Sequence, residues 1–148
     1  MTKIIHFICT GNTYRSRLAE AYFNSLKLPD IKAISSGINA GMTEDGPIEW
    51  YAMRLIHDNW LIEYMSRDSK RTSRELLNKG IFTVFMKPIH LDVCKNSLGY
   101  SSELNQVWNI EDLHPRGLDD NDIIETSEKT FEPIKAKVNS LAKMLVKQ

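Results

Sequence analysis

Short apolar runs alternate along this chain with stretches in which apolar residues recur at helical spacing. The short runs are typical of buried β-strands, and they lie at residues 4–8, 31–36, 81–86 and 107–110. Helical spacing follows the first run and is longest over residues 123–147. Strands that alternate with helices favour parallel pairing through right-handed crossovers. The sequence therefore predicts an α/β fold of three layers, in which a four-stranded parallel sheet has helices on both faces.

Three shorter helices are predicted between the second and fourth strands. Pro47 suits the first turn of one helix. Ser69 is the expected N-cap of another, which runs to Leu77. Residues 88–95 form the third, and Cys94 within it is interpreted as a structural residue. The apolar side of the first of these helices is expected to carry Trp50, Met53, Leu55, Ile56 and, at its end, Trp60.

The first strand runs directly into a polar loop that Cys9 opens and Arg15 closes, with five residues between them. Residues 9–16 are termed the phosphate loop. Consecutive backbone N–H groups in such a loop converge on an anion, and the N-terminus of the following helix adds its dipole. Gly11 and Asn12 suit the turn because both tolerate positive φ angles. The planar guanidinium of Arg15 matches two oxygens of a phosphate, so the loop is predicted to bind one.

Cys9 is expected at the bottom of this loop, where the positive field favours the thiolate. Ser16 is expected to donate a hydrogen bond to that sulfur. A thiolate beneath a bound phosphate is a nucleophile for phosphoryl transfer. The alternative is that Cys9 is a small core residue at the end of a buried strand. The Gly-Asn pair, the Arg-Ser close and the following helix favour the functional interpretation.

Hydrolysis of a phosphate ester also needs an acid for the leaving oxygen and later a base for water. Asp112 follows the last predicted strand, at the edge of the sheet where α/β proteins bind ligands. Its neighbour Glu111 is the competing carboxylate.

The stretch Cys9-Thr10-Gly11-Asn12-Thr13-Tyr14-Arg15-Ser16, followed by Leu18-Ala19-Glu20, resembles the signature of the low-molecular-weight protein tyrosine phosphatase family. The resemblance implies hydrolysis of phosphomonoesters through a cysteinyl-phosphate intermediate, with a phosphorylated protein or peptide as substrate and inorganic phosphate as product. It implies Cys9, Arg15 and Asp112 as catalytic residues, because Trp-x-Ile-x-Asp puts Asp112 in the family's register. The substrate-binding residues that it implies are Thr10, Gly11, Asn12, Thr13, Tyr14, Arg15 and Ser16.

The resemblance also implies side chains that support the loop. Asn12 and Ser16 are two of them. The family has a further serine after the second strand, and of Ser35 and Ser36 the better match is Ser36. A family histidine that helps to hold the loop is missing, and Ser66 is the candidate replacement.

The chain departs from the family pattern at Tyr14, Arg17, Lys87 and Leu113. A second cysteine commonly stands at the Tyr14 position and a proline at the Arg17 position. A proline also commonly follows the acid directly, whereas here Pro115 comes after Leu113 and one further residue. These departures leave open a catalytically impaired, phosphate-binding regulatory protein.

Two other branches of the family are alternatives. Thr13 resembles the bacterial protein-arginine phosphatases, so phosphoarginine stays open as a substrate beside phosphotyrosine. The branch that reduces arsenate generally needs two further redox cysteines. Only Cys94 remains here, which disfavours that activity.

Composition narrows the partners. The length of 148 residues predicts a single domain over residues 1–148. The 19 basic residues balance the 19 acidic ones, so the net charge does not indicate nucleic acid as a binding partner. No apolar run is long enough for a membrane span, and the first is too short for a signal peptide. Two cysteines suggest no disulfide framework, so a cytoplasmic location is expected. Asp119, Asp120 and Asp122 lack the full pattern of a calcium loop, so no metal and no other cofactor is predicted.

Overall fold

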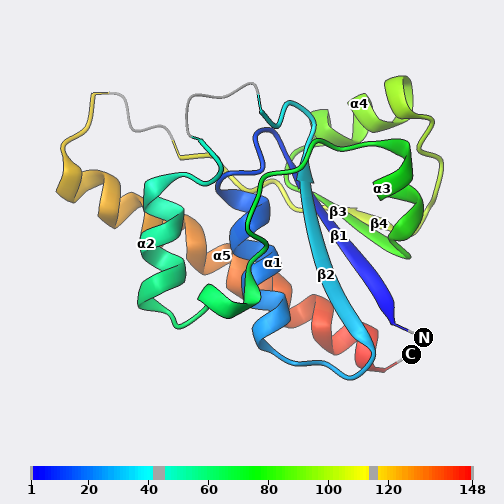
Figure 1. Ribbon diagram of the computed structural model, residues 1–148, viewed down its shortest axis with the longest axis horizontal. Helices are drawn as coiled ribbons and strands as arrows, with labels where there is room; N and C mark the ends of the chain where they lie inside the picture. Colours follow the sequence, from blue (N-terminus) through cyan, green and yellow to red (C-terminus); the bar gives the residue numbers. More distant parts are fainter. Residues whose placement is uncertain (1, 42–45, 114–116, 148) are drawn as a thin grey trace.

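The computed structural model describes residues 2–41, 46–113 and 117–147. Its centre is a parallel four-stranded sheet with the order β2-β1-β3-β4 (Figure 1). The strands are β1 (Lys3–Cys9), β2 (Ile31–Gly37), β3 (Phe82–Phe85) and β4 (Asn105–Val107). The next strand, β2, pairs with one edge of β1, and the strand after it, β3, pairs with the other edge. The end of β1 is therefore the switch point where such sheets bind ligands, and the phosphate loop begins there.

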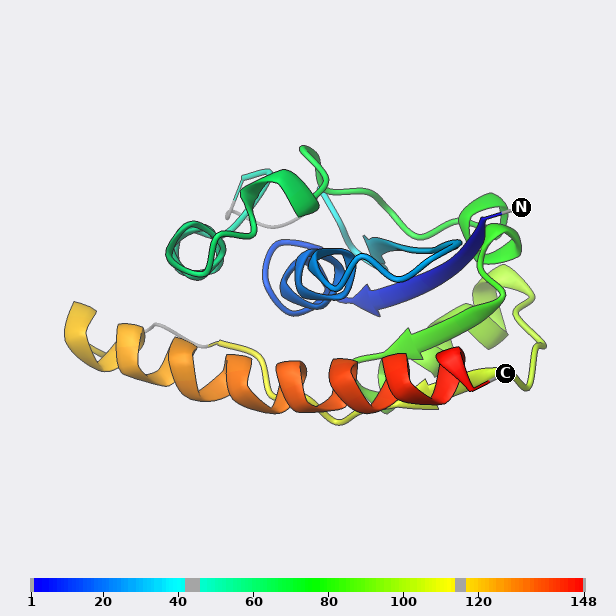
Figure 2. The same ribbon diagram turned by 90° about the horizontal axis from the view of Figure 1, so that it is seen from below.

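Helices cover both faces of the sheet, which confirms the predicted three-layer fold (Figure 2). On one face lie α1 (Arg15–Ser25) and α5 (Asp120–Val146), with α2 (Trp50–Asp58) beside them. On the other face lie α3 (Arg74–Lys79) and α4 (Pro88–Leu98). A single turn of 3-10 helix, η1 (Ile62–Tyr64), follows α2.

Alternation along β1 decides which residues face which layer. Phe7 packs in the larger apolar cluster with residues of α1 and α5. Ile8 packs in the smaller cluster with Phe85 and with Cys94 of α4. Burial raises the pKa of the Cys94 thiol to about 11. Cys94 is therefore a protonated core residue, in line with the structural role predicted for it.

The fourth strand lies earlier than the predicted range of 107–110. It ends at Val107, and Asn109 then adopts a left-handed φ of 55°, which a strand does not accommodate. The chain still follows β3, since the N–H of Ile110 donates to the carbonyl of Met86 at 2.8 Å. This course brings the carbonyl of Ile110 to the side chain of Arg15.

Helix α3 begins later than the predicted cap at Ser69, because the preceding residues pair with the end of β2. Gly37 donates to the carbonyl of Lys70 at 2.9 Å and accepts from the N–H of Thr72 at 3.0 Å. The chain stays extended through this bridge, and Ser73 caps the helix instead.

Helix α2 also begins later than predicted, after Pro47, with Glu49 as its cap. Trp50 and Trp60 were expected on its apolar side but are 63% and 88% exposed. The face that packs on the core is a narrower stripe at helical spacing, and Trp50 lies outside it. The buried residues of α2 are Ala52, Leu55 and Ile56.

Tyr14 ties the phosphate loop to the long helix α5. Its ring is buried, and its hydroxyl hydrogen-bonds to the side chain of Thr130 and donates to the carbonyl of Ser127 at 3.1 Å. Burial raises the pKa of the Tyr14 phenol above its ordinary value, so the hydroxyl keeps its proton.

Replacing Tyr14→Phe is expected to destabilise the fold by about 1–2 kcal/mol, because a buried hydrogen bond to α5 is lost. Urea denaturation measures this change. The control is Tyr51→Phe, which removes a hydroxyl that donates to Asp120 near the surface and should change stability less. Equal effects of the two variants would contradict the role of Tyr14 as an anchor.

Candidate active site

The phosphate loop wraps around the sulfur of Cys9. Cys9 Sγ accepts the backbone N–H of Asn12 at 3.3 Å and lies 2.9 Å from the hydroxyl oxygen of Ser16. Asn12 Nδ2 donates to that same hydroxyl at 2.8 Å, so Ser16 Oγ has one proton to donate, and Cys9 is a nearer acceptor for it than the carbonyl of Ser36 at 3.5 Å. The sulfur is therefore hydrogen-bonded on two sides.

Asn12 is the residue around which the loop is folded. It has a φ of 56°, the left-handed conformation that the sequence predicted Gly11 and Asn12 to tolerate. Its Nδ2 also donates to Ser35 Oγ at 2.9 Å, and its Oδ1 accepts the N–H of Lys70 at 2.8 Å. One side chain thus joins the loop to α1, to β2 and to the segment before α3.

The serine side chain that contacts Asn12 is that of Ser35, whereas the sequence analysis favoured Ser36. The side chain of Ser36 hydrogen-bonds to His6 and Thr72, each at 2.6 Å, on the other face of the sheet. Only its carbonyl reaches the loop, 3.5 Å from Ser16 Oγ. Strand alternation could have found this, since Ser35 lies opposite Phe7, which faces α1.

Arg15, near the end of the phosphate loop, is buried, and its guanidinium is hydrogen-bonded on two sides. Its Nη1 donates to the carbonyl of Ile110 at 3.1 Å, and its Nη2 donates to Thr10 Oγ1 at 3.3 Å. Nη2 also lies 3.5 Å from Asp112 Oδ2. Its buried Nε has no hydrogen-bond partner among the described residues. A buried guanidinium with one unused N–H at this loop suits an incoming oxyanion.

Of the two adjacent carboxylates, only that of Asp112 lies next to Arg15. Glu111 turns away and pairs with Lys87. The side chain of Asp112 is 40% exposed, so solvent can reach it. Its Oδ1 accepts the N–H of Leu113 at 2.9 Å. A proline after Asp112 has no N–H, so Leu113 adds a hydrogen bond that orients this carboxylate. Pro115 lies outside the described residues.

The other residues of the loop that were predicted to bind substrate take different places. Tyr14 directs its side chain into the protein, so only its backbone N–H is left for a ligand. Thr13 is buried, and its carbonyl accepts the N–H of Glu49 at 3.0 Å. Gly11 contributes backbone alone.

Arg17 is a supporting residue that the sequence analysis missed. It is fully buried, and its Nη1 donates to the carbonyls of Asn12 at 3.2 Å and Pro47 at 2.7 Å. Its Nη2 donates to the carbonyl of Ser66. Burial lowers the pKa of Arg17, and the nearby carboxylate of Glu20 acts in the opposite direction. Through these hydrogen bonds Arg17 supports the phosphate loop, at a position where family members commonly carry a proline.

Ser66 supports the loop indirectly. Its N–H donates to Glu20 Oε2 at 2.6 Å, and its hydroxyl donates to Oε1 at 3.2 Å. The same carboxylate accepts the hydroxyl of Ser35 at 2.7 Å. Ser66 therefore reaches the loop only through Arg17 and through this carboxylate.

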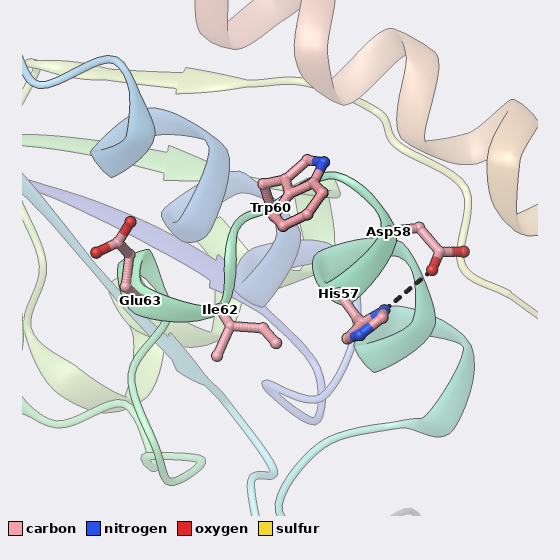
Figure 3. Close-up of a pocket in the computed structure, with 5 residues that line it drawn as sticks. All are labelled: His57, Asp58, Trp60, Ile62 and Glu63. Atoms are coloured by element: carbon pink, nitrogen blue, oxygen red, sulfur yellow. Dashed lines mark hydrogen bonds and ion pairs between the residues drawn. The ribbon is translucent and has the colours of Figure 1, made fainter.

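A separate pocket of about 560 Å³ lies at the C-terminal end of α2 (Figure 3). The phosphate loop instead contacts the residue that caps the start of α2. No residue of the predicted site lines this pocket. Its lining residues are His57, Asp58, Trp60, Ile62 and Glu63.

The described residues offer neither a metal site nor a membrane span. No group of three or more His, Cys, Asp or Glu side chains there is arranged to hold a metal ion. No helix within the same ranges has the length and apolar character of a membrane span.

The fold is an α/β fold, and a thiol at the end of its first strand, enclosed by a loop that an arginine closes at a helix N-terminus, is the arrangement expected of a cysteine-based phosphate site. The family model described as low molecular weight phosphotyrosine protein phosphatase matches residues 4–148. The chain belongs to this family, which confirms the resemblance inferred from the loop.

Known proteins resemble this chain in sequence or in fold. An arsenate reductase from Oceanobacillus iheyensis is 32% identical over 92 residues, which is 62% of this chain and 62% of the relative. The structure of a low molecular weight protein tyrosine phosphatase from T. tengcongensis is 22% identical, with a TM-score of 0.79 over 97% of this chain and 99% of the other. The YwlE arginine phosphatase from Geobacillus stearothermophilus is 20% identical, with a TM-score of 0.79 over 98% and 94%. At these identities the two structures show a shared fold.

The end of β2 approaches the phosphate loop so closely that Gly37 has no room for a side chain. A Cβ there would lie 2.5 Å from the carbonyl oxygen of Thr10 and 2.6 Å from the nitrogen of Asn12. Gly37→Ala is therefore expected to displace the loop and to weaken both phosphate binding and turnover, by on the order of 100-fold for turnover.

Isothermal titration with inorganic phosphate and assays of turnover measure the effect of Gly37→Ala. Gly80→Ala is the matched control, because its Cβ would meet the side chain of His6 at 3.1 Å, far from the loop backbone. If Gly37→Ala binds phosphate as the unchanged protein does, the close approach has no functional importance.

Proposed function

We propose that this protein hydrolyses phosphomonoesters through a cysteinyl-phosphate intermediate, as a single domain over residues 1–148. The observation that carries the proposal is the convergence of Cys9, Arg15 and Asp112 on one loop. A sulfur that accepts two hydrogen bonds, a guanidinium with an unused N–H and an accessible carboxylate are the groups that this chemistry needs.

In the first step, the thiolate of Cys9 attacks phosphorus as the bond from phosphorus to the leaving oxygen breaks. Asp112 gives its proton to that oxygen, and the phosphoryl group stays on sulfur. In the second step, Asp112 takes a proton from water as the water oxygen attacks phosphorus. The sulfur–phosphorus bond breaks, inorganic phosphate leaves, and the thiolate of Cys9 is restored.

Arg15 and the backbone N–H groups of the loop stabilise the equatorial oxygens as charge redistributes in each step. They are fixed before the substrate arrives, so little reorganisation is needed during the reaction. Ser16 stabilises the sulfur when it leaves, because its proton is available for that atom.

The proposed substrate is a phosphorylated protein or peptide, with phosphotyrosine first and phosphoarginine as the alternative. The family description favours tyrosine. The likeness to an arginine phosphatase and the presence of Thr13 keep the alternative in view. A nucleophilic thiol is best preserved in a reducing compartment, so we propose a cytoplasmic location.

Two other functions are less well supported. Arsenate reduction would follow from the relative in Oceanobacillus, but the second cysteine of this sequence, Cys94, is buried in the apolar cluster beneath α4. A regulatory protein that only binds phosphate would have no use for Asp112 beside Arg15.

Cys9→Ser is expected to abolish turnover of an aryl phosphate, and Asp112→Asn to lower kcat by about 10²–10⁴-fold. The deficit of Asp112→Asn should shrink as the leaving group becomes more acidic, because a better leaving group needs less protonation. Cys94→Ala and Glu111→Gln are the matched controls and should retain turnover. Full activity of Asp112→Asn across all leaving groups would exclude this residue as the acid.

Phosphotyrosine and phosphoarginine peptides of one sequence separate the two substrate classes. We expect a higher kcat/KM for phosphotyrosine, measured by release of inorganic phosphate. A clear preference for phosphoarginine would reverse the order. No turnover of either peptide, or of an aryl phosphate at any pH, would favour the regulatory protein.

A further inference from the structure

His90 of α4 contacts the phosphate loop although it lies 80 residues from its partner Thr10. The imidazole is fully buried, and both of its nitrogens have partners. Nδ1 accepts the backbone N–H of Lys87 at 3.0 Å, and Nε2 lies 2.9 Å from Thr10 Oγ1. Because Nδ1 accepts the N–H of Lys87, this nitrogen carries no proton of its own.

The ring is therefore neutral, with its proton on Nε2. Burial, and then the positive charges of Arg15 and Lys87, lower the pKa of His90 to about 4, so it stays neutral at physiological pH. In this tautomer Nε2–H donates to the hydroxyl oxygen of Thr10.

The hydroxyl of Thr10 consequently accepts two hydrogen bonds. One comes from His90, and the other comes from Arg15 Nη2 at 3.3 Å. A hydroxyl has two lone pairs and one proton, so its proton remains to be donated. Thr10 is partly exposed and directly follows Cys9 in the phosphate loop.

We propose that His90 is a positioning residue that fixes the Thr10 hydroxyl as a side-chain donor to the phosphoryl oxygens. The inference rests on the proposed function and deepens it. It adds one oriented donor to the backbone N–H groups of the loop. It also makes Thr10 a link that holds the guanidinium of Arg15 against His90, with Arg15 Nε left for the ligand.

A double-mutant cycle distinguishes this role from ordinary core packing. Thr10→Val keeps the shape of the side chain and removes the donor, and it is expected to lower kcat/KM and phosphate affinity about tenfold each. His90→Leu should cause a similar loss when Thr10 is present. In the Thr10→Val background, His90→Leu should add less than a twofold loss, because the group it orients is gone.

His90→Gln is the conservative variant, since its side-chain amide retains a donor, and it should recover most of the loss in His90→Leu. Thr10→Ser retains the hydroxyl and should recover most of the phosphate affinity that Thr10→Val loses. Thermal unfolding of each variant accounts for changes in stability.

Additive losses from Thr10→Val and His90→Leu would overturn the proposal, and so would a Thr10→Val variant with unchanged phosphate affinity. Affinity is measured by isothermal titration with inorganic phosphate, which needs no turnover. Absence of turnover in the unchanged protein would count against the proposed function, while the titrations still decide the role of His90.

Discussion

The phosphate loop keeps its shape because the side chain of one residue, Asn12, is hydrogen-bonded to three separate elements. Its left-handed backbone turns its own N–H toward Cys9, while its amide group binds Ser16, Ser35 and the backbone of Lys70. Left-handed backbone is unfavourable for most residues, and Asn is among those that tolerate it. The contacts that fix the conformation also place the donors around sulfur, so the fold of the loop also arranges the groups around the proposed nucleophile.

The departures from the family pattern each bring a contact of their own. Tyr14 anchors the loop to α5, where a cysteine would be too short to reach the same groups. Arg17 satisfies three carbonyls that surround the loop, including that of Asn12. Leu113 supplies an N–H that orients Asp112. At each of these positions the residue present makes a contact that supports the phosphate loop or Asp112. Cys9 and Arg15 are both kept in the loop.

The sequence predicts the parts of the site whose chemistry is local. The strand, the loop and the helix lie within one continuous stretch, so spacing alone indicates an anion site around Cys9. Contacts between segments that are distant in the sequence cannot be predicted from such spacing. His90 meets Thr10 across the sheet, and Arg17 meets Ser66 through a loop whose course depends on tertiary packing. The early start predicted for α3 fails for the same reason, because the bridge from Gly37 to Arg71 overrides the local capping signal at Ser69.

The central claim is that Cys9 is a reactive sulfur beneath a site for phosphate, and selective alkylation tests it most directly. Native protein is treated with iodoacetamide near neutral pH, with and without inorganic phosphate, and the labelled cysteine is located by mass spectrometry. We expect rapid labelling of Cys9 alone, slowed by phosphate, and loss of that protection in Arg15→Ala. Both cysteines are buried, so labelling of Cys9 no faster than that of Cys94, or a rate unaffected by phosphate, would contradict a reactive sulfur at Cys9.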